Sequence, residues 1–389
     1  MNSHSVGFLG NREMSRPRIL FVTWVYHGGE RVYPVIEPLL EHADVDVLAL
    51  DRMDPKYIWQ GDKDQRPKFY SLCNRLGVKL FHDRQHDPSP YDLLWFDDSY
   101  HKKNKNLVGF YIRWVRKLRA KTTASPHGLG WHFDKGPFLS VTHQPKHWDH
   151  NFLFGQTEFD VVARNRPGTR GYRNLAGGPP LGLRDNVTLG GIPSNDRLAY
   201  LKLPPPEYIL VLAGWLPSSP LIRGRMFLIN EYEGYKILNG EALVKAGINE
   251  LSRQLNLPVL ISQKTRKYQD KDDFSLWKGV NNFQMINDHL DHDDLISKAA
   301  VVVGAPTTLA IKSLILGIPT ILLRWYGISG LLGTYPGLVD LERDIFLKVY
   351  NQQKGEEHLI KEFAYRVSEG SRDGTATRIY VDKLVELAS

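Results

Sequence analysis

The sequence predicts an α/β protein built from two Rossmann-like domains that face a common cleft. Short runs rich in Val, Ile and Leu alternate with helical segments in both halves, as in parallel sheets covered on both faces. The densest Gly and Pro clustering, at residues 176–206, separates two stretches that each restart this alternation. A length of 389 residues also suits two domains better than one core.

The apolar runs and turn signals give the expected order of elements. We expect a flexible leader at 1–17, an N-terminal domain at 18–180 and a C-terminal domain at 181–389, whose last helices can pack back on the first domain. A helix is expected to follow the first strand through residue 40, and residues 125–154 read as a loop region rich in histidine. Strands are expected at 18–26, 44–50, 78–81, 93–96, 208–213, 259–262, 283–286 and 301–304.

The composition is that of a soluble globular protein and excludes several classes. Hydrophobic residues make up 42% and charged residues 24% of the chain, which excludes a disordered polar chain. No apolar stretch approaches ~20 residues, and the polar N-terminus lacks a signal-peptide core. Cys73 is the only cysteine, which excludes an internal disulfide and a thiolate zinc site. A cytoplasmic location is the simplest interpretation.

The formal charge of +7 is concentrated in one segment. Residues 101–121 contain eight Lys or Arg and no acidic residue, and the second half of this segment has helical spacing of its apolar residues. Such a patch can attract an anionic polymer, anionic lipid or nucleic acid, but it can equally be a solvated helix face. The basic residues that we expect to contact an acceptor are Lys102, Lys103, Arg113 and Arg116.

The segment at 294–324 is the most informative motif. It reads as a buried strand, a turn that contains Pro306, Thr307 and Thr308, a helix at 309–316 and a second apolar strand. Two hydroxyls and free backbone N–H groups at a helix N-terminus suit a diphosphate, and Gly304 allows close approach to the backbone. The alternative is an ordinary crossover with Thr307 as the N-cap.

Other candidate site residues follow expected strands at the sheet edge where α/β proteins bind ligands. Gly28 and Gly29 form the first turn, although the motif is not GxGxxG and supports a dinucleotide site poorly. Pro193 lies in a turn at 190–198 that suits a hinge at the cleft floor, where Asn195 or Asp196 could cap the following segment. Lys264 and Arg266 could neutralise the charge of the donor phosphates. The loop that begins at Gly214 could close over the same ligand.

Two residues could carry acid–base chemistry. His127 precedes a glycine in an expected loop and could be a general base, although a surface histidine among the fourteen in this chain is the simpler reading. Asp97 ends an expected parallel strand and could act as a base or orient His127, or else cap the next segment. The remaining histidines have no spacing typical of a metal site, so no metal is expected.

The order of segments resembles transferases of the GT-B architecture, in particular the CDP-glycerol glycerophosphotransferase-like group. The hydrolysing UDP-N-acetylglucosamine epimerases are more distant structural relatives. Three patches carry the resemblance: a His-Gly loop at His127, a Gly-x-Pro-x-Asn-Asp-x-Leu-like segment at 191–198, and a donor-site unit at 294–323. The loop after His127 and the residues after Gly304 depart from the group's Thr-Pro-Leu-Lys-like and Asp-Tyr-Ser-Ser patterns, so a glycosyl group is at least as good a candidate as glycerophosphoryl.

The resemblance implies a transferase that uses a nucleotide-diphosphate sugar as co-substrate and needs no cofactor. The C-terminal domain would bind the donor, and the N-terminal domain the acceptor, with His127 as the base and Asp97 as its orienter. The basic segment favours an anionic acceptor, either a cell-surface glycan at a membrane periphery or, as second choice, DNA with hydroxylated bases. A non-catalytic module that binds a nucleotide or polyanion is the hypothesis from a different class.

Overall fold

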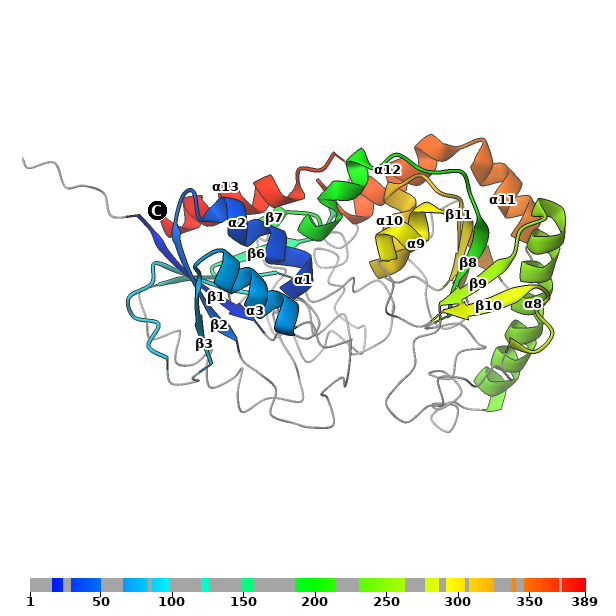
Figure 1. The fold of residues 1–389 in the computed structure, drawn as a ribbon, viewed down its shortest axis with the longest axis horizontal. Helices are drawn as coiled ribbons and strands as arrows, with labels where there is room; N and C mark the ends of the chain where they lie inside the picture. Colours follow the sequence, from blue (N-terminus) through cyan, green and yellow to red (C-terminus); the bar gives the residue numbers. More distant parts are fainter. Residues whose placement is uncertain are drawn as a thin grey trace, which may run out of the picture.

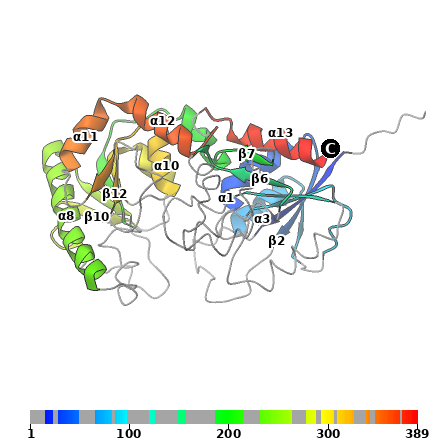
Figure 2. The ribbon, with the colours of Figure 1, turned by 180° about the vertical axis from the view of Figure 1, so that it is seen from behind.

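The computed structural model describes most of both halves of the chain. The described residues are 16–23, 29–49, 66–82, 86–97, 120–125, 148–156, 186–213, 231–262, 277–286, 292–304, 308–324, 337–340, 346–370 and 373–389. Two parallel sheets, each with its own helices, lie side by side in the two halves (Figures 1 and 2). Within these ranges, no helix combines the length and low polarity that a membrane span requires.

The first half contains a seven-stranded parallel sheet with the order β3-β2-β1-β4-β5-β6-β7. Its strands are β1 (Arg18–Thr23), β2 (Asp44–Ala49), β3 (Lys79–Phe81), β4 (Leu93–Phe96), β5 (Lys121–Ala124), β6 (His150–Leu153) and β7 (Val187–Leu189). The strand order reverses between β1 and β4, which makes this pair the topological switch point of the sheet. The helices of this half are α1 (Gly29–Val32), the 3₁₀ helix η1 (Tyr33–Val35), α2 (Ile36–Leu39) and α3 (Arg66–Arg75).

The second half contains a six-stranded parallel sheet with the order β10-β9-β8-β11-β12-β13, which reverses between β8 and β11. Its strands are β8 (Tyr208–Leu212), β9 (Val259–Ser262), β10 (Phe283–Ile286), β11 (Ala299–Gly304), β12 (Thr320–Arg324) and β13 (Leu338–Asp340). The helices are α8 (Glu231–Leu255), α9 (His292–Ser297), α10 (Thr308–Ile315), α11 (Phe346–Lys354) and α12 (Glu357–Val367).

Both sheets are covered on both faces, which explains their continuous apolar strands. In β1, Ile19 and Phe21 face a core built with α2 and α3, while Leu20 and Val22 face a second core on the other side. In β11, Val302 packs toward α10 and α12, and Val301 and Val303 pack toward α8 and α11. The period of two therefore buries residues 19–23 of β1 and 301–304 of β11 from both sides.

The chain crosses between the halves twice. The 3₁₀ helix η7 (Pro193–Tyr200) follows β7 on the way to β8, and α13 (Ala376–Ala388) runs back along the first half (Figures 1 and 2). Tyr380 of α13 stacks on Phe152 of β6 with ring centroids 4.0 Å apart. Because β7 belongs to the first sheet, the boundary placed after residue 180 precedes the last strand of that sheet, and the chain changes sheet between β7 and β8.

Two local expectations differ from the structure. The helix expected to run through Leu40 is divided into α1, η1 and α2, because Pro34 in the first turn of η1 has no N–H to continue an α-helical ladder. Strand β6 lies in the region read as a loop. Its sequence, His-Asn-Phe-Leu, has polar residues that the fold buries, so the hydrophobic pattern gave too weak a signal.

Candidate functional site

The carboxyl ends of four strands define the candidate site, because ligands of open α/β sheets bind at switch points. In the first sheet, Val22 of β1 pairs with Phe96 of β4, so the next residues, Thr23 and Asp97, lie opposite each other. In the second sheet, β11 pairs with β8 up to Gly304 opposite Leu212. The sequence had placed Asp97 and Gly304 at these sheet edges, and both lie there.

Asp97 is held rigidly at the first switch point. Thr23 Oγ1 donates a hydrogen bond to Asp97 Oδ2, and the backbone N–H of Asp97 donates to Val22 O at 3.1 Å. Thr23 and Asp97 are almost completely buried. A buried carboxylate with a hydroxyl donor has a fixed orientation, as the positioning of a base or an acceptor hydroxyl requires.

Ser125, which the sequence analysis did not single out, continues this polar edge onto β5. Its N–H donates to Phe96 O at 2.8 Å, and its hydroxyl accepts a hydrogen bond from Trp95 Nε1 at 2.8 Å. Ser125 is buried and lies two positions before His127 in the sequence. Three neighbouring strands thus end in polar residues at this edge of the sheet.

At the second switch point, Gly304 is tightly packed against the neighbouring strand. A Cβ atom added there would lie 3.0 Å from Leu212 Cβ and 3.2 Å from Leu212 O, so a larger residue would require Leu212 to shift by a few tenths of an ångström. Thr308 is the first residue of α10, which buries Ala310, Ile311 and Leu314 in the core. The helix N-terminus therefore lies near the carboxyl edge of β11, where the sequence predicted a diphosphate site.

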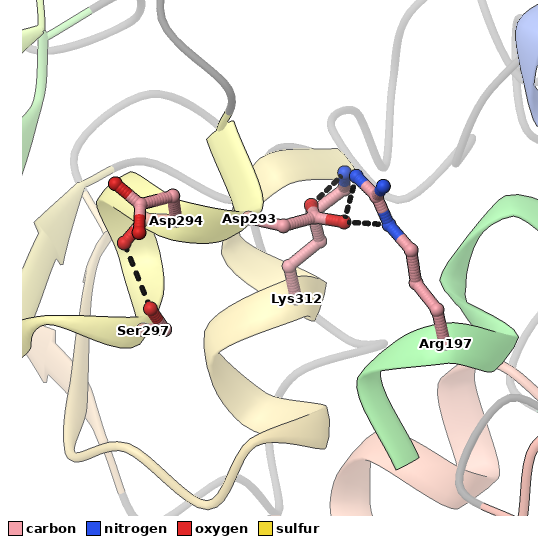
Figure 3. A network of polar contacts seen from close by, with 5 residues as sticks. All are labelled: Arg197, Asp293, Asp294, Ser297 and Lys312. Atoms are coloured by element: carbon pink, nitrogen blue, oxygen red, sulfur yellow. Dashed lines mark hydrogen bonds and ion pairs between the residues drawn. The ribbon is translucent and has the colours of Figure 1, made fainter. Parts of the chain in front are cut away.

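An ionic network adjoins α10 (Figure 3). Lys312 Nζ donates to Asp293 Oδ1, and Arg197 contacts Asp293 Oδ2 through Nε and Nη2, each at 2.5 Å. The carboxylate is nearly buried, with 7% of its side chain exposed, while Arg197 is 63% exposed. We name these three residues the Asp293 junction. Two cations share one carboxylate, so the Asp293 junction carries a net positive charge beside the donor helix.

The sequence offered one signal for this network. Lys312 is the single charged residue in the apolar helix Thr-Leu-Ala-Ile-Lys-Ser-Leu-Ile. A buried lysine requires a counterion, so a partner carboxylate could have been expected. Asp293 and Asp294 both lie in the first turn of α9, and nothing in the sequence singles out Asp293 from its neighbour.

Pro193 lies between the halves, because it opens η7, which contacts α1 and η1 of the first half and α10 of the second. Gly29, at the start of α1, belongs to an element that touches η7. Asp196 was expected to cap the segment that follows it. Instead its carboxylate accepts the N–H groups of Ala376 at 3.0 Å and Thr377 at 2.7 Å, so it caps α13.

Burial and the hydrogen bonds of Asp196 have opposite effects on its pKa. Burial raises the pKa of Asp196, and the hydrogen bonds from Thr377 and Ala376 lower it by a smaller amount. Its neighbour Asn195 is 1% exposed, and both polar atoms of its side chain lack a hydrogen-bond partner in the structure as described. The crossover is thus anchored by Asp196 rather than by Asn195.

His150, from the histidine-rich region, is a buried residue of the first sheet. It lies in β6, where its Nε2 is 2.9 Å from Thr188 Oγ1 of β7. Burial lowers the pKa of His150 to about 4, with a further lowering by Lys383 and an opposing effect of Glu386. Across the ranges described, no group of three or more His, Cys, Asp or Glu side chains is arranged to hold a metal.

The remaining candidates lie outside the described residues. They are Gly28, Lys102, Lys103, Arg113, Arg116, His127, Gly214, Lys264, Arg266, Pro306 and Thr307.

Comparison with known proteins gives a match at the level of structure. No protein-family model matches the sequence, and no curated protein matches it significantly. The UDP-GlcNAc 2-epimerase of Neisseria meningitidis, solved with bound UDP-GlcNAc, is 12% identical, with a TM-score of 0.56 over 95% of this chain and 100% of its own. A glycosyltransferase from Rickettsia africae is 10% identical, with a TM-score of 0.53 over 96% of this chain and 98% of its own.

This chain has the GT-B fold. The HepE protein of Anabaena, solved in complex with UDP, is a third GT-B neighbour, with 11% identity and a TM-score of 0.53 over 95% of this chain and 97% of its own. The matches cover 95–96% of this chain, so the GT-B likeness extends over both halves. Identities this low show the fold alone, and GT-B neighbours include both transferases and epimerases.

Proposed function

We propose that the protein is a GT-B transferase that moves a glycosyl group from a nucleotide-diphosphate donor to a hydroxyl of an anionic acceptor such as a cell-surface glycan. The observation that carries the proposal is the position of α10. Its N-terminus lies at the switch point of the second sheet and beside the positively charged Asp293 junction. Amide N–H groups and excess positive charge together favour a diphosphate.

The donor half has the features that a nucleotide-diphosphate sugar requires. The helix start at Thr308, together with Pro306 and Thr307, would bind the diphosphate. Lys264, Arg266, Pro193 and the loop from Gly214 would complete the donor site. The epimerase neighbour with UDP-GlcNAc and the HepE neighbour with UDP-glucose support a nucleotide-activated donor, and a glycerophosphoryl donor is the finer alternative.

The acceptor half would supply the acid–base chemistry. The acceptor oxygen bonds to the transferred carbon while that carbon's bond to the diphosphate oxygen breaks, and the nucleoside diphosphate leaves with the electron pair. His127 would take the acceptor proton, and Asp97, fixed by Thr23, would orient His127 or substitute for it. Positive charge at α10 would stabilise the leaving diphosphate without a metal.

The basic segment suggests what the acceptor is. Lys102, Lys103, Arg113 and Arg116 would attract a polyanion, and Gly28 and Gly29 would let it approach the first strand's turn. The same charge favours a second candidate, a glycosyltransferase that acts on hydroxylated bases of DNA. A cell-surface glycan ranks first because the sequence contains no base-reading motif.

The proposal is tested by thermal-shift screening against UDP-, CDP-, GDP- and dTDP-activated sugars, followed by transfer assays with glycan acceptors and with duplex DNA that contains hydroxymethylated bases. A cognate donor at about 100 times its Kd adds about 2.7 kcal/mol of stability and raises the melting temperature. Loss of transfer in His127→Ala, with retained donor binding, would support the assigned base. Stabilisation by a nucleotide without transfer to any acceptor would favour the non-catalytic binding module.

A further inference from the structure

The Asp293 junction connects the crossover helix η7 to two helices of the second half. Arg197 belongs to η7, which contacts α1, η1 and α13, and α13 packs in the core of the first half. Asp293 and Lys312 belong to α9 and α10 of the second half. The carboxylate of Asp293 therefore joins the crossover helix to the helix at the proposed donor site.

The geometry of these contacts restricts the movement of η7 relative to α9 and α10. Arg197 presents two nitrogens to one carboxylate oxygen at 2.5 Å, and Lys312 takes the other oxygen. A planar guanidinium fixes orientation more strictly than a single ammonium contact. Asp293 has 7% and Lys312 16% of its side chain exposed, so solvent screens their pair weakly.

The neighbouring Asp294 shows what a local ion pair looks like on the same helix. Its carboxylate contacts Lys298 at 3.0 Å, four residues further along the chain, and 64% of its side chain is exposed. Asp293 points toward Arg197 and Lys312, whereas Asp294 points away from both (Figure 3). Of the two adjacent aspartates, Asp293 thus contacts the crossover helix and α10, and Asp294 contacts a residue just after the end of α9.

From this geometry we infer that Asp293 is a positioning residue that sets the orientation of the donor half relative to the crossover. Through Lys312 it orients α10, and through Arg197 it ties α10 to η7, the crossover helix that also contacts α1 and η1 of the first half. This inference rests on the proposed function for its consequence, which is that donor affinity depends on the junction. The role of Asp293 in orienting the donor half relative to the crossover does not depend on any ligand.

The test measures the distance between spin labels on the two halves. Labels are placed at Glu41→Cys and Arg253→Cys, both exposed sites, in a Cys73→Ala background. Arg197→Met removes the contact of Asp293 with the crossover helix and keeps the pair of Asp293 with Lys312, so it is the decisive variant. Asp293→Asn removes the carboxylate charge that Arg197 and Lys312 both contact. Asp294→Asn is the matched control on the same helix.

We expect a broader or shifted distance distribution in Arg197→Met and Asp293→Asn, and the wild-type distribution in Asp294→Asn. With a sugar donor that binds the wild type, the Kd should rise about tenfold in the first two variants, within the usual range of coupling between sites. Wild-type distributions in Arg197→Met and Asp293→Asn would overturn the inference, as would an equal change in Asp294→Asn. Absence of donor binding by the wild type would reject the proposed function, while the distance measurement still decides the role of the junction.

Discussion

At the scale of single residues, the first switch point depends on a buried polar pair. Asp97 and Thr23 end adjacent strands, and a hydroxyl–carboxylate hydrogen bond joins them inside the protein. A buried carboxylate such as that of Asp97 needs its hydrogen-bond donors, because the loss of a donor leaves part of its charge unsatisfied inside the protein.

Replacing Thr23 by Val should show this dependence. The substitution keeps the shape of the side chain but removes the donor to Asp97, so we expect a loss of about 1–3 kcal/mol in the free energy of unfolding. Urea unfolding followed by circular dichroism measures it. A change below about 0.5 kcal/mol, the range of neutral surface substitutions, would mean that the hydroxyl contributes little to holding Asp97.

His150 should give the protein a defined acid sensitivity. Its pKa is about 4 in the folded protein and 6.5 as the unperturbed value, so below pH 6.5 the unfolded chain takes up a proton that the folded protein does not. The contribution of neutral His150 to the free energy of unfolding is complete above pH 6.5 and is lost as the pH drops toward 4. The loss over that interval amounts to about 3 kcal/mol.

Urea unfolding across this pH interval should therefore show a steeper loss of stability in the wild type than in His150→Gln. The exposed His42→Gln serves as the control and should keep the wild-type slope. Equal slopes in the wild type and His150→Gln would show that His150 takes up its proton equally in both states.

At the scale of elements, the crossover is defined by one glycine and one aspartate. Gly191 has a φ of +71°, and a Cβ there would lie 1.7 Å from Glu369 O, so both conformation and space require glycine. Asp196 then caps α13 from η7, joining residues that are 180 positions apart.

Gly191→Ala should be strongly destabilising. Gly77, with a φ of +68° and no atom within 4 Å of an added Cβ, is the matched control for backbone conformation alone. We expect about 1–2 kcal/mol for Gly77→Ala, the cost of a left-handed residue. Gly191→Ala should exceed this by several-fold or prevent folding, as thermal unfolding will show. Equal losses at both sites would mean that the backbone of residue 369 moves away without a large penalty.

Asp196→Ala should destabilise the protein by about 1–2 kcal/mol, because two N–H groups at the start of α13 lose their acceptor. Asp196→Asn keeps one acceptor oxygen and should lose less. Asp382→Ala, an exposed position on the same helix, should change stability by less than about 0.5 kcal/mol. Urea unfolding of the three variants measures this order, and an order with Asp382→Ala as the largest effect would reject the capping role.

The elements differ in how well the sequence predicted them. Strands such as β9 and β10 have the expected bounds, because apolar runs between turn signals give a local pattern. Strand β6 was missed because His150 and Asn151 are polar residues that only the surrounding fold buries. Asp97 and Gly304 were predicted at sheet edges, since strand ends are visible in sequence. The Asp293 junction was not, because it joins residues 96 and 19 positions apart.

At the scale of the whole molecule, the two halves share packing at the crossover. Phe154 and Ile192, which flank the end of the first sheet, belong to the same core cluster as Leu210 of β8. The apolar core and the Asp293 junction thus connect the switch points of two sheets through η7. In the proposed function, this connection would hold the donor half and the acceptor half in a defined relative position.

The central claim is that the start of α10 binds the diphosphate of a nucleotide. A crystal structure with UDP, or with whichever nucleoside diphosphate gives the largest thermal shift, tests it most directly. Diphosphate oxygens should lie within hydrogen-bond distance of the backbone N–H groups at the start of α10, on the side of the molecule where η7 meets this helix. A nucleotide bound elsewhere, with the start of α10 covered by other parts of the chain, would contradict it.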